Sequence, residues 1–230
     1  MGNYFEISEL EKAIGYEFKD KSLLKLALTH SSYSNELKIG KYGNYERIEF
    51  LGDAVLELMS SQFFYNEYPD MNEGQLTRLR SSMVCEQALS FCAREFELQK
   101  YILLGKGEEG TGGRNRDSII ADVFEAVLGA MYIDGGFEIA NQFVKDHVLT
   151  DLKNKQLFYD AKTILQEEIQ KDGKSLSYVI ISEEGPDHDK LFKVQAVVDG
   201  NIIGEGTGKS KKQAEQEAAY SYLRKNKSVE

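Results

Sequence analysis

Apolar residues recur at spacings of three and four through the first two thirds of the chain, and no stretch there alternates convincingly between apolar and polar positions. Those spacings place apolar side chains on one face of a helix. The pattern predicts an all-α domain over residues 1–152. Gly135 and Gly136 follow its second acidic, apolar segment and predict the end of that helix.

A polar stretch at residues 153–159 separates this part from a different pattern. Residues 161–171 have helical spacing, residues 176–182 predict a strand, and apolar residues alternate from Phe192 to Val198 as in a half-buried strand. A small second domain with the order α-β-β-β-α over residues 160–228 is therefore expected, with the stretch 153–159 as its linker. Such an order packs one face of a sheet against two helices.

The end of the second domain is predicted in more detail. Asp199, Gly200 and Asn201 indicate a hairpin turn, which leads to a short third strand at residues 202–205. Ser210 and Gln213 fit a capping box that opens a final helix through Lys225.

Composition removes several classes of protein. The chain has 230 residues, of which 41% are hydrophobic, and no apolar run approaches the roughly 20 residues that span a bilayer. The segment Met1–Glu6 lacks the basic and apolar regions of a secretory signal, so we expect a cytoplasmic protein with no membrane partner. Cys85 and Cys92 have no histidine nearby, which favours reduced packing residues over a zinc site.

The net charge of −10 argues against nucleic acid as a partner only if the chain is treated as one body. Residues 1–159 carry 17 basic and 25 acidic side chains, whereas residues 160–230 carry 11 and 13, so the difference is −8 in the first part and −2 in the second. Charges are screened over about 8 Å at physiological salt, so local clusters matter more than the sum. An acidic part that holds cations can still face RNA.

Two pairs of acids lie inside strongly apolar helical segments: Glu49 with Asp53, and Asp122 with Glu125. Spacings of three and four put both members of a pair on one helix face. Repulsion between them costs only roughly 0.2–0.5 kcal/mol on an exposed helix, but unpaired charges lose several kcal/mol on desolvation. A bound metal ion would compensate this cost, whereas solvated helix faces are the plainer interpretation of each pair alone.

Two further segments have candidate chemistry. The glycine-rich stretch from Gly105 to Gly113 contains Glu108 and Glu109 and lacks the order of a phosphate-binding loop, so we expect a mobile connector and no nucleotide cofactor. Three lysines at the start of the last helix oppose the helix dipole but suit an anion such as phosphate; they are Lys209, Lys211 and Lys212.

The second domain resembles the double-stranded RNA-binding domain in three segments. Its first helix matches positions through which that family touches a minor groove, and the stretch Pro186–His188 resembles the loop that enters the next minor groove. The lysine group resembles the set that grips phosphates across the major groove between them. Such domains recognise A-form shape and 2′-hydroxyls more than sequence. The RNA-binding residues implied are Thr163, Gln166, Glu167, Gln170, His188, Lys209, Lys211 and Lys212.

The first domain resembles bacterial ribonuclease III. Residues 46–56 are similar to that family's signature E-R-L-E-F-L-G-D-A-V-L, with Ile48 at a leucine position, and residues 122–125 and 28–33 resemble two further family segments. The resemblance implies that all four acids form one magnesium site, which manganese can also occupy. Hard oxygen ligands and the absence of any Glu-x-x-His sequence agree with that metal. The expected ligands are Glu49, Asp53, Asp122 and Glu125, with Asp53 and Glu125 as the least replaceable, catalytic pair.

The same resemblance implies an endoribonuclease that hydrolyses double-stranded RNA to 5′-phosphate and 3′-hydroxyl ends with short 3′ overhangs, in ribosomal RNA precursors and structured messenger RNA. Phe50 is either a core residue or, as the resemblance suggests, a contact in a homodimer. Glu46 and Glu73 either support the metal site or RNA binding, or are surface acids. Arg114 and Arg116 either meet phosphates or are solvated.

Two other functions stay open at this stage. A non-cleaving RNA-binding protein needs the second domain but not four intact carboxylates. A metal-dependent phosphohydrolase of small nucleotides uses the acids but leaves the RNA-binding domain without a purpose.

Overall fold

The computed structural model describes residues 4–40, 42–150, 152, 161–185, 190–208 and 210–227. It divides the chain into two compact units, which we call the helical unit (Met1–Thr150) and the mixed unit (Asp151–Glu230). The predicted fold class, an all-helical domain followed by an α-β-β-β-α domain, is confirmed. Within the described ranges, no helix is long and apolar enough to cross a membrane.

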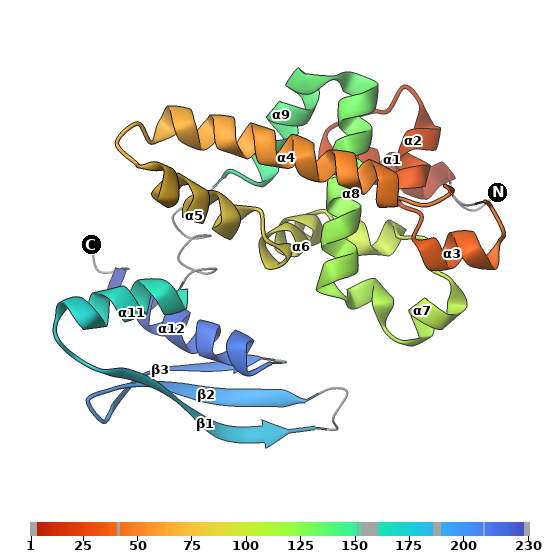
Figure 1. Ribbon diagram of the computed structural model, residues 1–230. Coiled ribbons are helices and arrows are strands. Elements are labelled where there is room, and N and C mark those ends of the chain that lie inside the picture. Colours follow the sequence, from red (N-terminus) through yellow and green to blue (C-terminus); the bar gives the residue numbers. More distant parts are fainter. Residues whose placement is uncertain are drawn as a thin grey trace. The chain divides into compact units, whose positions relative to one another are not determined.

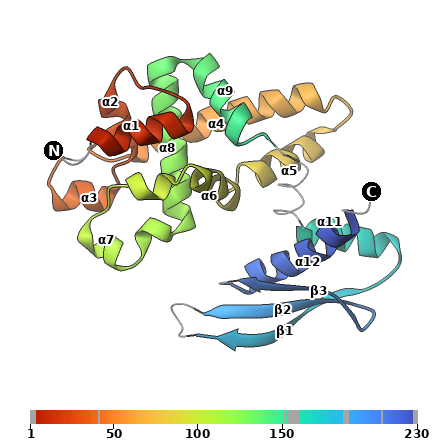
Figure 2. The ribbon, with the colours of Figure 1, turned by 180° about the vertical axis from the view of Figure 1, so that it is seen from behind.

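The helical unit is organised around one apolar helix, α8, which α4 crosses (Figures 1 and 2). Most of α8 from Ile119 to Met131 is buried, and Gly136 ends the helix with φ 84°, as the glycine pair predicts. The helices of the unit are α1 (Tyr4–Ile14), α2 (Lys21–Ala27), α3 (Ser31–Glu36), α4 (Glu46–Glu67), α5 (Glu73–Met83), α6 (Glu86–Glu95), α7 (Lys106–Gly110), α8 (Asp117–Gly135) and α9 (Phe137–His147), with 3₁₀ turns η1 (Leu98–Tyr101) and η2 (Gly113–Asn115).

Two glycines let α4 and α8 approach each other closely. A Cβ atom on Gly52 of α4 would lie 1.8 Å from the carbonyl oxygen of Glu125, and one on Gly129 of α8 would lie 2.4 Å from the carbonyl oxygen of Ile48. Real Cβ contacts of this kind do not occur below 3.0 Å. The two helices therefore touch backbone to backbone at this crossing, one residue from Asp53 and at Glu125 itself.

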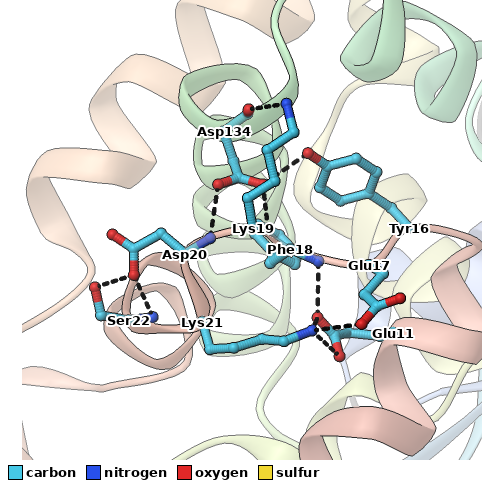
Figure 3. A network of polar contacts seen from close by, with 9 residues as sticks. All are labelled: Glu11, Tyr16, Glu17, Phe18, Lys19, Asp20, Lys21, Ser22 and Asp134. Carbon is cyan, nitrogen blue, oxygen red and sulfur yellow. Dashed lines mark hydrogen bonds and ion pairs between the residues drawn. The ribbon is translucent and has the colours of Figure 1, made fainter.

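Asp134, in the last turn of α8, joins the N-terminal segment to that helix through hydrogen bonds (Figure 3). Its carboxylate accepts hydrogen bonds from the Tyr16 hydroxyl at 2.7 Å and from the backbone N–H groups of Lys19 and Asp20 at 2.8 and 3.0 Å. Next to it, the buried carboxylate of Glu11 accepts from the Phe18 N–H and the Lys21 ammonium. These contacts fix the connection between α1 and α2 to the helix that carries two of the site acids.

Replacement of Asp134 by alanine is expected to lower the free energy of unfolding by about 2 kcal/mol, because three donors lose their acceptor and the site is partly open to water. Urea unfolding followed by circular dichroism measures this. Asp146→Ala is the control, since Asp146 is exposed and accepts a hydrogen bond from the neighbouring Gln142 amide. Equal urea midpoints for the two variants would show that the hydrogen bonds of Asp134 do not stabilise the fold.

The glycine-rich stretch differs from its expectation. Instead of a plain connector it forms α7 and η2, because two ion pairs close it on itself. Arg114 contacts the Glu109 carboxylate through two nitrogens, and Arg116 lies 2.8 Å from Glu108. The side chains of each pair meet only when the segment folds. The spacing of the residues along the sequence therefore does not predict these pairs.

The mixed unit contains one antiparallel sheet with the order β1-β2-β3, covered on one face by two helices (Figure 1). Asp199 and Gly200 both have positive φ, 49° and 82°, as a two-residue type I′ hairpin requires. The buried core is apolar and includes Leu165, Val194 and Ala218. The elements are α11 (Ala161–Lys171), β1 (Leu176–Glu184), β2 (Leu191–Val198), β3 (Asn201–Gly208) and α12 (Lys211–Lys227).

Strand β3 is longer than predicted, and its alternating glycines explain why. Added Cβ atoms on Gly204 and Gly206 would lie 2.3 and 2.2 Å from the backbone of Ala218, and one on Gly208 would lie 2.6 Å from that of Ala214. These glycines lower the strand propensity that a sequence pattern detects, but they allow α12 to lie directly on the sheet. The hairpin and the start of the final helix are where the sequence predicts them; the Gln213 N–H donates to the Ser210 hydroxyl at 3.2 Å.

Candidate active site

The four predicted acids lie on the two helices that cross at Gly52 and Gly129. Glu49 and Asp53 are on α4, and Asp122 and Glu125 are on α8. Glu49, Asp122 and Glu125 are half-buried, whereas Asp53 is exposed. Three of the four acids are therefore partly shielded from water, whereas Asp53 faces it.

Burial and mutual repulsion perturb these carboxyl groups strongly. Desolvation, followed by the charges of Asp122, Glu46 and Asp53, raises the pKa of Glu49 from 4.5 to about 7. Desolvation, followed by the charges of Asp53, Glu49 and Asp122, raises the pKa of Glu125 from 4.5 to about 8. The charges of Glu49 and Asp53 thus act on Glu125 across the crossing, and that of Asp122 acts on Glu49, so the four acids form one electrostatic cluster.

Tyr45 and His30 form a wall beside Asp122. The buried Tyr45 directs its hydroxyl to the Asp122 carboxylate at 3.4 Å, a long hydrogen bond, and its ring centroid lies 5.7 Å from that of His30. The His30 Nδ1 accepts from the Ser32 N–H, which caps α3. Desolvation lowers the pKa of His30, so this wall is uncharged at neutral pH. Burial also raises the pKa of Asp122.

The donor set fits a hard divalent cation. The cluster offers carboxylate oxygens only, and oxygen is the ligand that Mg²⁺ prefers. No three His, Cys, Asp or Glu side chains of the described residues already converge as a metal site. The fit rests instead on the chemistry of the donors, because clustered acids with raised pKa values are those whose ionised form a cation would stabilise.

The neighbouring charged residues separate into near and distant ones. Glu46 is exposed in the first turn of α4, and its charge contributes to the raised pKa of Glu49. Glu73, in the first turn of α5, accepts a hydrogen bond from the Thr77 hydroxyl, and it is not among the charges that raise the pKa of Glu49 or Glu125. Arg114 and Arg116 are engaged in the ion pairs of the glycine-rich segment.

The raised pKa values predict how pH affects the metal-free protein. Between pH 4.5 and about 8 the folded state binds more protons at Glu49 and Glu125 than the unfolded state does, so the free energy of unfolding falls as pH rises. We expect a loss of about 1–2 kcal/mol from pH 5 to pH 8, since one pKa unit is about 1.4 kcal/mol without screening and solvent at these half-buried groups screens most of the effect. Urea midpoints in chelator measure it.

The control for this prediction is the double variant Glu49→Gln, Glu125→Gln, which keeps His30 and all other titrating groups. The free energy of unfolding of wild type minus that of this variant should decline steadily from pH 4.5 to about 8. Added magnesium should make this decline smaller. A difference that is independent of pH would show that the two carboxyl groups titrate normally.

In the mixed unit, the predicted minor-groove residues share one face of α11. Thr163, Glu167 and Gln170 are exposed and Gln166 is half-buried, while the opposite face packs into the core through Leu165 and its neighbours. Lys211 and Lys212 are exposed in the first turn of α12. The stretch Pro186–His188 and Lys209 lie outside the described residues.

Phe50 is 78% exposed on α4, which removes the interpretation that it packs in the core of its own chain. Leu58 and Tyr65 on the same helix are 58% and 73% exposed. Large apolar side chains of this kind on one helix are typical of a protein interface.

The sequence pattern assigns no role to Tyr45, and His30 falls only within residues 28–33, a segment that resembles the family. Burial of a tyrosine next to an acidic pair gives no local signal, because the partner, Asp122, is 77 residues away.

Both units match known families. A family model described as "Ribonuclease-III-like" matches residues 20–152, and one described as "Double-stranded RNA binding motif" matches residues 161–226.

Similar proteins cover nearly the whole chain. Ribonuclease 3 of Listeria welshimeri is 46% identical over 214 residues, which is 92% of this chain and 93% of that protein. Ribonuclease 3 of Bacillus velezensis is 46% identical over 223 residues, or 96% and 90% of the two chains. A solved structure of the nuclease domain of ribonuclease III from Campylobacter jejuni, which concerns the region involved in dimer formation, is 39% identical with a TM-score of 0.58, covering 62% of this chain and 95% of that one.

Proposed function

The chain belongs to the ribonuclease III family, the double-strand-specific endoribonucleases, and from this premise we propose that its two acidic pairs form the magnesium site at which RNA is cut. The observation that carries the proposal is the cluster on α4 and α8, in which Glu49 and Glu125 have pKa values of about 7 and 8. Functional sites are where such shifts concentrate.

The residues have distinct parts in this proposal. Glu49, Asp53, Asp122 and Glu125 hold the cation, and manganese can replace magnesium there. The bound ion supplies positive charge at the attacked phosphodiester and promotes attack by water. Asp53 and Glu125 are the catalytic ligands, and Tyr45 orients Asp122 from behind. In-line hydrolysis leaves 5′-phosphate and 3′-hydroxyl ends.

The mixed unit binds the duplex in this proposal. The exposed face of α11, with Thr163, Gln166, Glu167 and Gln170, lies in one minor groove and His188 in the next. Lys209, Lys211 and Lys212 contact phosphates between them. Glu46 and Glu73 support the metal site or contact the RNA.

The exposed apolar side chains of α4 support a homodimer with Phe50 at its contact. A two-fold dimer presents two sites to one duplex and gives staggered cuts with short 3′ overhangs. Sedimentation at micromolar concentration tests this; a monomer with full activity would rule the dimer out.

The substrates proposed are stems of ribosomal RNA precursors and of messenger RNA, and the proposed location is the cytoplasm. A radiolabelled RNA hairpin and a single-stranded control are incubated with the protein in magnesium, in calcium and in chelator, followed by end-group analysis. Magnesium-dependent cleavage of the hairpin alone, with 5′-phosphate ends, is expected. Tight binding without cleavage in every metal would leave a binding protein, and hydrolysis of free nucleotides instead would indicate a phosphohydrolase.

A further inference from the structure

One carboxylate of the mixed unit holds two lysines at once. Glu183, near the end of β1, has one oxygen 3.3 Å from the ammonium of Lys211 and the other 3.6 Å from that of Lys190. Lys211 opens α12, and Lys190 lies just before β2. The end of β1, the start of β2 and the start of α12 lie at the same end of the sheet (Figures 1 and 2).

The position of Lys211 is defined by a second contact. Its ammonium lies 5.7 Å from the centroid of the Phe192 ring, within the range of a cation–π interaction. Phe192 is the residue paired with Glu183 across the β1–β2 ladder. The ammonium of Lys211 is therefore held between an aromatic ring and a carboxylate, both fixed by the sheet.

We propose that Glu183 is a built-in competitor of RNA phosphate for Lys211, and that it lowers the affinity of this protein for duplex RNA. The inference rests on the proposed function, in which Lys211 contacts phosphate. A phosphate oxygen at about 3 Å from Lys211 would lie within about 6 Å of the Glu183 carboxylate, less than the Debye length of about 8 Å. The two negative groups therefore repel each other with little screening, and Lys211 must exchange one for the other when RNA binds.

This contact affects binding to every duplex equally, because it concerns the phosphate backbone and not the bases. A lower affinity for the phosphate backbone favours release of the cleaved duplex, since both products keep the same phosphates. Glu183 therefore acts on the strength of RNA binding and not on the chemistry of cleavage.

The test compares Glu183→Gln with Glu184→Gln in the full chain. Both remove one negative charge from neighbouring exposed positions of β1, but successive strand residues point to opposite faces. Binding to an RNA duplex of about 20 base pairs, longer than the roughly 16 that such a domain spans, is measured in chelator over a range of salt concentrations. Urea midpoints establish that both variants are folded.

Glu183→Gln is expected to bind about three- to tenfold tighter at low salt and to steepen the dependence of log K on log salt concentration by about 1. Glu184→Gln should bind like wild type. In cleavage assays Glu183→Gln should lower KM and leave the single-turnover rate at saturating RNA unchanged. Unchanged or weaker binding by Glu183→Gln would overturn the proposal, the weaker result showing that Glu183 prepares Lys211 for RNA.

Lys211→Gln separates this inference from the proposed function. It should weaken binding, and adding Glu183→Gln to it should give much less than the tightening seen in wild type. If Lys211→Gln binds normally, the proposed phosphate contact of Lys211 is wrong. If Lys211→Gln weakens binding but Glu183→Gln does not strengthen it, the contact stands and the competition is wrong.

Discussion

Replacement of Gly52 by alanine is expected to lower the free energy of unfolding by about 3 kcal/mol or more and to abolish RNA cleavage. The new Cβ would lie 1.8 Å from the carbonyl oxygen of Glu125 and 2.6 Å from its carbonyl carbon. Both are backbone atoms in the middle of a buried helix, so neither can turn aside as a flexible side chain would. The helices α4 and α8 must separate at the point where their acids meet.

Gly107→Ala is the matched control, because an added Cβ there meets nothing within 4 Å and the residue lies in a helix, α7. It should unfold at or slightly above the urea concentration of wild type. Gly129→Ala, with its Cβ 2.4 Å from the Ile48 carbonyl oxygen, should resemble Gly52→Ala. A Gly52→Ala protein within about 1 kcal/mol of wild type would show that the crossing is not tight.

The parts of the fold that depend on local chemistry could be predicted from sequence. The helix at residues 161–171 has the predicted bounds because its apolar spacing is regular, and the β2–β3 turn follows from Asp199 and Gly200, which tolerate positive φ. The family resemblance predicted one site from the four acids; burial and the charges of Asp53, Glu49 and Asp122 raise the pKa of Glu125, and the metal site itself stays a prediction.

The parts that depend on distant contacts could not. Gly52 and Gly129 look like weak points in their helices until the other backbone is seen against them. The glycine-rich segment reads as a connector because the pairing of Arg114 with Glu109 and of Arg116 with Glu108 arises only on folding. The exposure of Asp53 beside three half-buried acids also depends on the angle at which two helices cross, which no pattern along one helix contains.

Replacement of Glu125 by glutamine is expected to lower kcat/KM for duplex cleavage in magnesium by about 10³-fold or more, while leaving the protein folded. Glutamine keeps the shape of the side chain but removes the negative charge that the cation requires. Since burial and its neighbours raise the pKa of Glu125 to about 8, its carboxyl group is mostly protonated at neutral pH in the metal-free protein. The uncharged amide therefore resembles the state that the fold already accommodates.

This prediction separates a catalytic role from a structural one. In chelator, Glu125→Gln should be about as stable as wild type near pH 4.5 and more stable at pH 7, and the difference should stop growing above about pH 8, because wild type loses stability only between the pKa of the unfolded carboxyl group and that of the folded one. It should also gain less stability from added magnesium than wild type does, because the stabilisation by a ligand grows with its affinity and the variant has lost one ligand to the ion. Glu138→Gln, at an exposed position of α9, is the control and should match wild type in all three assays. If Glu125→Gln cleaves at more than a tenth of the wild-type rate in saturating magnesium, Glu125 is not a catalytic ligand. The acidic cluster would then be an electrostatic feature of the helix crossing without a part in the reaction.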